Sequence, residues 1–267
     1  MKPEAERFLR EGSGPLDDLA LTLPVFVGYH LGVVFLPMRN AADMVTRELT
    51  NLAKNDLGVY SLITITLGFA FAGILLILGR RQSLRAWRFL LVGLEGILYA
   101  VAMRVVAGYI VGRLHLGFDL LSHLGFIPDP STFRDAAAAG AAASEPGVIQ
   151  PLTNSAFAGA IMSLGAGFYE ELVFRVVLFG LGFRLFSHGF PATAAAKRGL
   201  FAVMWAVLCA LAFSGWHYVG EFGDPFEVRS FVFRWVCGLV FTLIYAFRGF
   251  APAVWTHALY DLWIMVF

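Results

Sequence analysis

The chain has 267 residues, of which 58% are hydrophobic and 15% are charged, and its formal net charge is +1. This composition is typical of a polytopic membrane protein and argues against a soluble domain, which needs a larger polar surface. The near-zero charge argues against a nucleic-acid partner, because binding phosphates would require clustered Lys and Arg. The two cysteines, Cys209 and Cys237, lie in apolar stretches, so we expect small buried hydrophobic side chains and no disulfide framework.

The apolar segments predict one all-α domain, a polytopic transmembrane helical bundle of about seven spans. Residues 1–18 are polar and have no signal-peptide cleavage pattern, so we expect a cytosolic N-terminal segment. An amphipathic helix on the membrane interface is expected over residues 40–56. The expected spans are near the roughly 20 residues needed to cross the hydrocarbon core, and they cover residues 19–36, 58–78, 86–111, 154–186, 199–219, 230–247 and 249–267.

The distribution of charge between the spans predicts their orientation. The densest basic loop follows the second span and contains Arg80, Arg81, Arg85 and Arg88. Cytoplasmic loops are enriched in Lys and Arg, so this loop and the N-terminus are expected on the cytoplasmic side. The longest polar interruption, residues 117–150, has few positive charges and is expected outside. It separates N-terminal helices and loops within residues 19–150 from C-terminal helices within residues 151–267.

The first polar cluster, Glu170, Glu171 and Arg175, lies within the fourth expected span. An ionisable side chain at the centre of a membrane helix costs roughly 2.5 to 3.5 kcal/mol on insertion scales, so these residues need partners or water. Glu171 and Arg175 are four residues apart, in the favourable order for an ion pair on one helix face. Glu170 points about 100° away on an α-helix and is free to be a general base. The alternative is an ion pair that only joins helices.

The second cluster lies in the fifth expected span, where Phe213 and His217 share a helix face. Phe213 could form the apolar side of a site, although a core aromatic is its default interpretation. A single histidine at the end of a span is more often a hydrogen-bonded interface residue than a catalyst. His217 is a candidate because polar clusters in two other spans accompany it.

The third cluster lies in the last expected span, where His257 and Asp261 are four residues apart. The pair could be a histidine oriented by an acid, two metal ligands, or donors to a transition state, and the spacing does not decide among them. Together the three clusters supply carboxylates, imidazoles and a guanidinium from three apolar helices, which indicates a hydrolytic centre that activates water. The sequence has no motif of serine hydrolases, of single-helix zinc peptidases or of nucleotide-binding folds.

For other charged residues in the apolar segments, a structural role is at least as well supported by the sequence as a contact with the substrate. Glu95 and Arg104 are nine residues apart, so they point to opposite helix faces, and we expect each to face other helices. The remaining histidines have no comparable partner nearby in the sequence, and we expect them to be structural or interfacial: His30, His115, His123 and His188.

The three clusters follow the order Glu-Glu-x-x-x-Arg, Phe-x-x-x-His and His-x-x-x-Asp in the C-terminal part of the chain. In this order the sequence resembles the CPBP intramembrane proteases, which include the CAAX prenyl endopeptidases of eukaryotes and the bacteriocin-processing and Abi-type proteins of bacteria. The resemblance implies CPBP-like catalytic helices in residues 151–267.

The resemblance also implies roles for individual residues. Glu170 would be the general base on a water molecule that His217 also holds. His257, with Asp261, would stabilise the oxyanion of the tetrahedral intermediate. The supporting residues would be Glu171, Arg175 and Phe213.

Position 261 departs from the prenyl-processing members, which usually have Asn there. An ionised Asp261 could not donate a hydrogen bond to an oxyanion, so it must be protonated, orient His257, or bind a metal. A zinc site needs about three protein ligands and an open position, which Glu170, His217 and His257 could supply. We favour a glutamate-dependent mechanism without a cofactor, and a zinc-dependent one is the alternative.

The expected function is that of an intramembrane endopeptidase acting on a membrane-associated or lipidated protein, in a hydrated cavity between helices. The expected partners are this substrate and the lipid bilayer, and the sequence does not predict the oligomeric state. Similarity to bacterial members suggests the bacterial inner membrane. Two alternatives stay open: a non-catalytic membrane partner or immunity protein of the same family, and a proton-coupled transporter. The transporter is disfavoured because the polar groups concentrate in three late spans.

Overall fold

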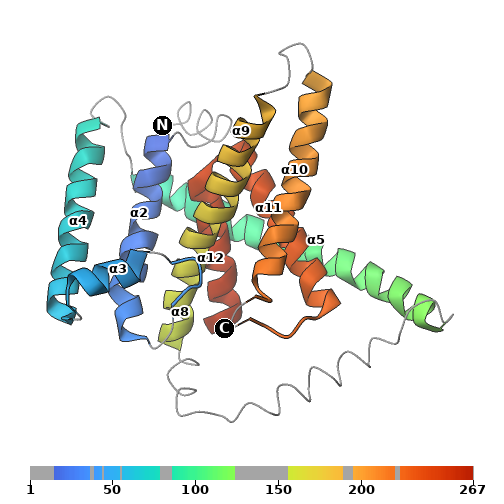
Figure 1. The fold of residues 1–267 in the computed structure, drawn as a ribbon, viewed down its shortest axis with the longest axis horizontal. Helices are drawn as coiled ribbons and strands as arrows, with labels where there is room; N and C mark the ends of the chain where they lie inside the picture. The colour runs from blue at the N-terminus through green and yellow to red at the C-terminus, as the bar shows by residue number, and fades with distance from the viewer. Residues whose placement is uncertain are drawn as a thin grey trace, which may run out of the picture.

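The computed structural model describes residues 15–36, 39–43, 45–54, 56–78, 86–123, 156–188, 195–219 and 223–266. Every regular element within these ranges is a helix (Figure 1), so the all-α class is confirmed. The expectations for residues 1–14 and 124–150 lie outside the described residues. The helices are α2 (Pro15–Gly32) with η1 (Val33–Phe35), α3 (Val45–Leu52), α4 (Leu57–Leu78), α5 (Ala86–His123), α8 (Ala156–Gly165), η3 (Ala166–Glu170), η4 (Leu172–Leu181), α9 (Gly182–Ser187), α10 (Ala195–Trp216), α11 (Val228–Arg248) and α12 (Phe250–Val266).

Five helical stretches are long and apolar enough to cross a membrane, and they correspond to five of the seven expected spans. The other two expected spans have a different form. The fourth consists of four consecutive helical segments from α8 to α9, and the last is α12, which has 17 residues. The fold is therefore a polytopic helical bundle, and the number of crossings stays a prediction.

Two expected boundaries are wrong. Helix α5 continues to His123, although a polar loop was predicted to begin at residue 117. The interface helix predicted over residues 40–56 is limited to α3, because Asp43 accepts hydrogen bonds from the N–H groups of Val45 and Thr46, both at 2.9 Å, and so caps the helix at that point. Residues 39–43 before α3 form a connection without regular structure.

Helix α12 lies at the centre of the bundle, where it packs against α5, α8, α11, η3 and α2 (Figure 1). Its ties to α2 are polar as well as apolar: the backbone N–H of Ala251 donates to Asp18 Oδ1 at 2.7 Å, and Trp255 Nε1 donates to the Leu21 carbonyl at 2.9 Å. Helix α5 crosses behind the other helices at a steep angle. The central position of α12 keeps His257 buried.

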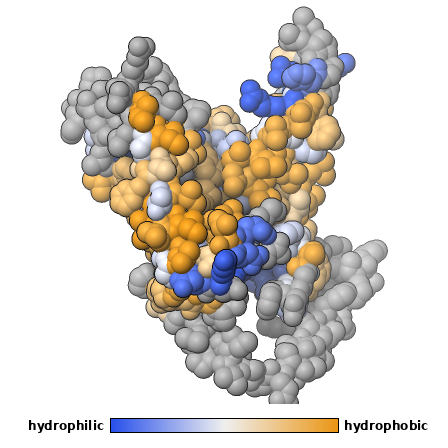
Figure 2. Space-filling view, turned by 60° about the vertical axis from the view of Figure 1, so that its left-hand side comes forward, coloured by the Kyte–Doolittle hydropathy of each residue, from blue (hydrophilic) through white to orange (hydrophobic). Residues whose placement is uncertain are grey.

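The periphery of the bundle is apolar. Helix α4 packs against α2 and α3 and presents large hydrophobic side chains outward, among them Leu62 and Phe69. Figure 2 shows hydrophobic residues over most of the described surface on the face in view, with hydrophilic residues gathered at two ends. This pattern is the one expected of a protein whose solvent is lipid around its middle and water at its ends.

Two glycines allow the helices that carry the site to come together. A Cβ atom on Gly167 would lie 2.7 Å from the Ala258 side chain and 2.9 Å from the Val254 carbonyl oxygen, so η3 and α12 approach closely only because this position has no side chain. Gly249 has a φ of 101° and is the single residue between α11 and α12. Both positions require glycine, for space at the first and for backbone conformation at the second.

The isolated polar residues of the apolar helices have structural partners, as expected. Glu95 of α5 accepts hydrogen bonds from Arg248 Nε at 2.5 Å and from the Tyr99 hydroxyl at 2.7 Å. The Arg104 guanidinium lies 5.1 Å from the centre of the Trp263 ring. Both cysteines are free and buried.

The histidines outside the three clusters differ in their surroundings. His30 is fully buried, with Nε2 at 2.7 Å from the Tyr169 hydroxyl and Nδ1 at 3.1 Å from the Tyr60 hydroxyl, and is structural as expected. His188 is exposed and its Nδ1 donates to the Arg184 carbonyl at 3.2 Å. The expectations for the side chains of His115 and His123 lie outside what the structure describes.

Candidate active site

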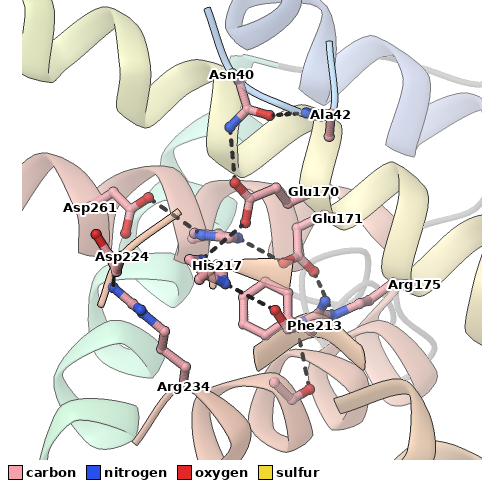
Figure 3. Close-up of polar contacts among 12 residues, drawn as sticks. Asn40, Ala42, Glu170, Glu171, Arg175, Phe213, His217, Asp224, Arg234 and Asp261 are labelled. Carbon is pink, nitrogen blue, oxygen red and sulfur yellow. Dashed lines mark hydrogen bonds and ion pairs between the residues drawn. The ribbon is translucent and has the colours of Figure 1, made fainter. Parts of the chain in front are cut away.

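The carboxylates of Glu170 and Glu171 are both buried, but they point to different neighbours (Figure 3). They lie where η3 meets η4, in a stretch with π-helical hydrogen bonding rather than the α-helix on which the 100° expectation was based. π-Helical turns are rare and occur frequently at functional sites. The two side chains still point in different directions, as expected, and each carboxylate therefore has its own partners.

Glu171 is fully buried, and each of its oxygens faces a basic side chain, although Oε2 accepts no hydrogen bond from the described residues. Its Oε2 lies 3.1 Å from Arg175 Nε, in the ion pair that the four-residue spacing predicts. Its Oε1 accepts a hydrogen bond from His257 Nδ1 at 2.8 Å. Glu171 therefore links its own helix to α12 and neutralises a buried guanidinium.

The guanidinium of Arg175 is also surrounded by aromatic rings. It lies 4.3 Å from the centre of the Phe213 ring and 5.2 Å from that of Phe241, within the range of cation–π contacts. The Phe213 ring also meets both candidate histidines edge to face, at 5.1 Å from the His217 ring and 5.9 Å from the His257 ring. Phe213 thus joins the side chains of the three clusters in one place.

His217 lies just beyond the end of α10, and its ring is fixed by the backbone. Its Nδ1 donates to the Phe213 carbonyl at 2.9 Å, which leaves Nε2 directed at Glu170 Oε2, 3.7 Å away. The His217 carbonyl accepts a hydrogen bond from the backbone N–H of Asp224 at 2.8 Å, and the side chain of Asp224 pairs with Arg234 at 2.5 Å. The connection between α10 and α11 is thereby held against His217.

Glu170 has one satisfied oxygen and one unsatisfied oxygen. Its Oε1 accepts a hydrogen bond from Asn40 Nδ2 at 2.9 Å. Its Oε2 is buried and accepts no hydrogen bond from the residues that the structure describes, although it faces His217. Glu171 Oε2 also accepts no hydrogen bond from the described residues, but it has the guanidinium of Arg175 at 3.1 Å, whereas Glu170 Oε2 faces only the imidazole.

His257 is buried between two carboxylates. Besides the Glu171 contact at Nδ1, its Nε2 lies 3.4 Å from Asp261 Oδ2. Its ring stacks on Phe241, with the ring centres 4.5 Å apart and the planes 18° from parallel. Since an imidazole donates from both nitrogens only as the imidazolium, the cationic form fits this position.

The three residues considered as zinc ligands do not form one ligand set. Glu170 and His217 face each other, whereas both nitrogens of His257 are directed at Glu171 and Asp261. Across the described ranges no three His, Cys, Asp or Glu side chains form a group that could hold a metal ion. These donors therefore do not fit the three-ligand zinc site that the sequence allowed.

The structure brings all seven candidate residues into this one region and adds a residue that the sequence analysis missed. Asn40 comes from the connection before α3, in a segment predicted as an interface helix. Its contact with Glu170 joins residues 130 positions apart, and no periodic pattern in the sequence signals such a contact.

Comparison with known proteins finds a family model that matches the C-terminal part of the chain. Residues 152–263 match the family model of the type II CAAX prenyl endopeptidase Rce1-like proteins. This part of the chain is therefore similar to the CPBP proteases that the sequence analysis named. The match includes Glu170, His217, His257 and Asp261. Asn40 lies outside the matched residues. No curated protein and no solved structure matches the chain.

The similarity to CAAX prenyl endopeptidases and the five apolar helices both support an integral membrane protein. The family is one of hydrolases, which agrees with a site built from carboxylates and imidazoles.

Proposed function

We propose that this protein is a glutamate-dependent intramembrane endopeptidase that hydrolyses a peptide bond of a membrane-associated or lipidated protein. Glu170 and His217 activate the attacking water molecule, and His257 with Asp261 stabilises the oxyanion. The observation that carries the proposal is the 3.7 Å separation between Glu170 Oε2 and His217 Nε2.

These two atoms are both hydrogen-bond acceptors. The proton of the neutral His217 ring is on Nδ1, because that nitrogen donates to the Phe213 carbonyl. Two acceptors that face each other at this distance repel unless a donor lies between them. Because Glu170 Oε2 is buried, a water molecule reaches it only when the surrounding side chains move apart, and it can then donate to both atoms. Its oxygen is then held beside a base and is free to attack a carbonyl carbon.

In the proposed reaction the water oxygen forms a bond to the carbonyl carbon of the substrate while its proton passes to Glu170. The carbonyl oxygen becomes an oxyanion. When the tetrahedral intermediate collapses, the C–N bond breaks and Glu170 returns the proton to the leaving amine. The products are a new carboxyl terminus and a new amino terminus.

His257 is suited to stabilise the oxyanion because it is held in place by its other nitrogen. The 2.8 Å contact with Glu171 fixes Nδ1, and the 3.4 Å contact of Nε2 with Asp261 is the weaker of the two. With the ring fixed, the Nε2–H group can share its hydrogen bond with a developing negative charge that lies beside Asp261. In this proposal Asp261 orients His257 and does not itself donate to the oxyanion.

The substrate class follows from the surroundings of the site. The site lies among helices whose outer faces are apolar, and the family is named for a prenyl endopeptidase. A lipidated or transmembrane peptide can reach such a site from within the bilayer. The charge pattern of the loops supports a cytoplasmic N-terminus, and we propose the bacterial inner membrane as the location.

Purified protein in liposomes tests the proposal, with an internally quenched peptide bearing a farnesylated C-terminal CAAX sequence as the first probe and single-span peptides as the second. We expect cleavage by the wild type and a loss of about 10²- to 10⁴-fold in Glu170→Ala and His217→Ala, as for removal of a general base. Equal cleavage by all three proteins would exclude both residues from catalysis. Cellular function that persists in both variants would favour the non-catalytic family member.

Metal dependence is tested separately in the same assay. We expect incubation with a chelator, followed by its removal, to leave cleavage unchanged. Activity that disappears with the chelator and returns with zinc would replace the glutamate-dependent mechanism by a metal-dependent one.

A further inference from the structure

The side chain of Asn40 contacts the candidate base from a part of the chain outside the matched residues 152–263. Its Nδ2 donates to Glu170 Oε1 at 2.9 Å, and Asn40 and Glu170 are only 8% and 7% exposed (Figure 3). A hydrogen bond to an ionised carboxylate belongs to the strong class, and burial shields this one from water. Among the described residues it is the one hydrogen bond that the Glu170 carboxylate accepts.

We propose that Asn40 is a positioning residue for Glu170, an inference that rests on the proposed function because it gives the base its orientation. The last torsion of a Glu side chain is soft, so an unrestrained carboxylate would sample many rotations. With Oε1 held by the Asn40 amide, Oε2 is directed at His217 Nε2, 3.7 Å away. Asn40 thus selects which oxygen faces the reacting water.

The orientation of the Asn40 amide is itself determined by its other contact. Its Oδ1 accepts a hydrogen bond from the backbone N–H of Ala42 at 2.9 Å. Only the oxygen of an amide can accept, so the NH2 group must be the end that meets Glu170. The amide therefore has one arrangement that satisfies both neighbours.

The connection that carries Asn40 is anchored to the bundle. The Tyr29 hydroxyl accepts a hydrogen bond from the backbone N–H of Asn40 at 3.2 Å and donates one to Asp43 Oδ2 at 2.8 Å. Burial opposes ionisation of Asp43, but hydrogen bonds from Thr46 and Tyr29 hold the pKa of this carboxyl below its ordinary value. An ionised Asp43 that caps α3 and holds Tyr29 keeps Asn40 at a fixed place above Glu170.

Two substitutions at this position separate positioning from loop folding. Asn40→Asp keeps the Oδ1 acceptor for Ala42 but puts an acceptor where the donor to Glu170 was. Asn40→Ala removes both contacts. A residue needed only to fold the connection would leave Asn40→Asp near the wild type and make Asn40→Ala the worse variant.

For a positioning residue we expect the opposite order in the peptide-cleavage assay. The kcat of Asn40→Asp should fall about 10- to 100-fold, at least as far as that of Asn40→Ala, because a hydrogen bond to a charged group is lost. The KM should stay unchanged, since Asn40 does not bind the substrate in this proposal. A kcat of Asn40→Asp equal to that of the wild type, or a loss through KM alone, would overturn the inference.

Asp43→Ala is the matched control for the connection. It removes the cap of α3 and the acceptor of the Tyr29 hydroxyl and so loosens the connection, but it leaves the donor of Asn40 and the acceptor of Glu170 chemically intact. We expect a lower thermal unfolding midpoint and a smaller loss of kcat than in Asn40→Asp. If Asp43→Ala lost as much kcat as Asn40→Asp, the order of the connection rather than the amide would explain the effect.

A chemical measurement keeps this inference separate from the proposed function. Dicyclohexylcarbodiimide modifies protonated carboxyl groups in apolar surroundings, and mass spectrometry locates the modified residue. Loss of the Asn40 donor should speed labelling of Glu170 severalfold and leave Glu171 unchanged as an internal reference. If the wild type cleaved no probe but labelling changed in this way, the proposed function would fail and the positioning would stand. If the wild type cleaved and Asn40→Asp matched it in both measurements, only the positioning would fail.

Discussion

Glu170 and Glu171 are neighbours in the chain, yet the regions around them differ in almost every respect. Glu171 lies between two basic groups: Oε1 accepts a hydrogen bond from His257, and Oε2 is 3.1 Å from the guanidinium of Arg175, which aromatic rings enclose. Among the described residues Glu170 has no such cation: Oε1 is held by Asn40, and the buried Oε2 faces the ring of His217 at 3.7 Å. The same side chain thus neutralises a permanent charge at one position and faces an imidazole at the next.

The difference teaches that the charge of the nearest partner, rather than burial or residue type, separates a supporting carboxylate from a candidate base. Both glutamates are buried and each has one oxygen without a hydrogen bond from the described residues, so neither property would have told them apart. A carboxylate bound to a permanent cation is stabilised in its ionised form, whereas one that faces an imidazole can take a proton from water.

The comparison predicts the largest effect for Glu170→Gln. The Gln side chain keeps the shape and the acceptor for Asn40 but is no base, so we expect peptide cleavage to fall about 10²- to 10⁴-fold. The thermal unfolding midpoint should not fall, because no buried charge loses a partner. Measured cleavage within tenfold of the wild type would break the distinction between the two carboxylates.

Glu171→Gln should have the complementary effect, on stability. The buried Arg175 charge would lose its partner, which destabilises a protein by about 3 to 5 kcal/mol. Chemical unfolding in detergent micelles measures this loss. The double variant Glu171→Gln with Arg175→Leu should recover part of the stability, because it also removes the uncompensated charge. No difference between the single and double variants would contradict the ion pair.

A smaller effect is expected where η3 touches α12. Gly167→Ala would put a methyl group 2.7 Å from the Ala258 side chain and 2.9 Å from the Val254 carbonyl oxygen, so the two helices must separate. We expect a loss of about 1 to 3 kcal/mol in the free energy of unfolding. Gly108→Ala is the control, because nothing lies within 4 Å of an added Cβ atom there. An equal response of the two variants would argue against the close approach.

The smallest effect is expected for Asp261→Asn. Asn retains an oxygen that can accept from His257 Nε2, so cleavage should stay within about tenfold of the wild type. Asp261→Leu removes that acceptor and should lose more activity. The two kcat values, measured on one probe, decide the question. A wild-type rate in Asp261→Leu would show that Asp261 does not orient His257.

The sequence was most informative where contacts are local. The ion pair between Glu171 and Arg175 followed from their spacing, and five of the expected spans correspond to helices of sufficient length. The extra length of α5 was missed because its end is more polar than its middle. The π-helical stretch at Glu170 was missed because hydrophobic periodicity does not distinguish it from an α-helix.

Contacts between residues far apart in the chain could be predicted from the sequence only in part. The convergence of the three clusters was inferred because buried charges in apolar helices must find partners. The sequence did not predict which side chains become partners. Whether His257 contacts Glu171 or Glu170 depends on how η3 packs on α12. Nothing in the sequence predicted the contact of Asn40 with Glu170, because Asn is common in the connections between helices.

The polar ties between α2 and α12 have a consequence for biogenesis. Asp18 accepts a hydrogen bond from the backbone N–H of Ala251, and Trp255 donates one to the Leu21 carbonyl. The inward-facing side of the first described helix therefore packs against the last. During translation α2 is made long before α12 emerges from the ribosome. Its inward-facing polar groups must therefore wait in the bilayer, or with a membrane chaperone, until α12 has been synthesised and inserted.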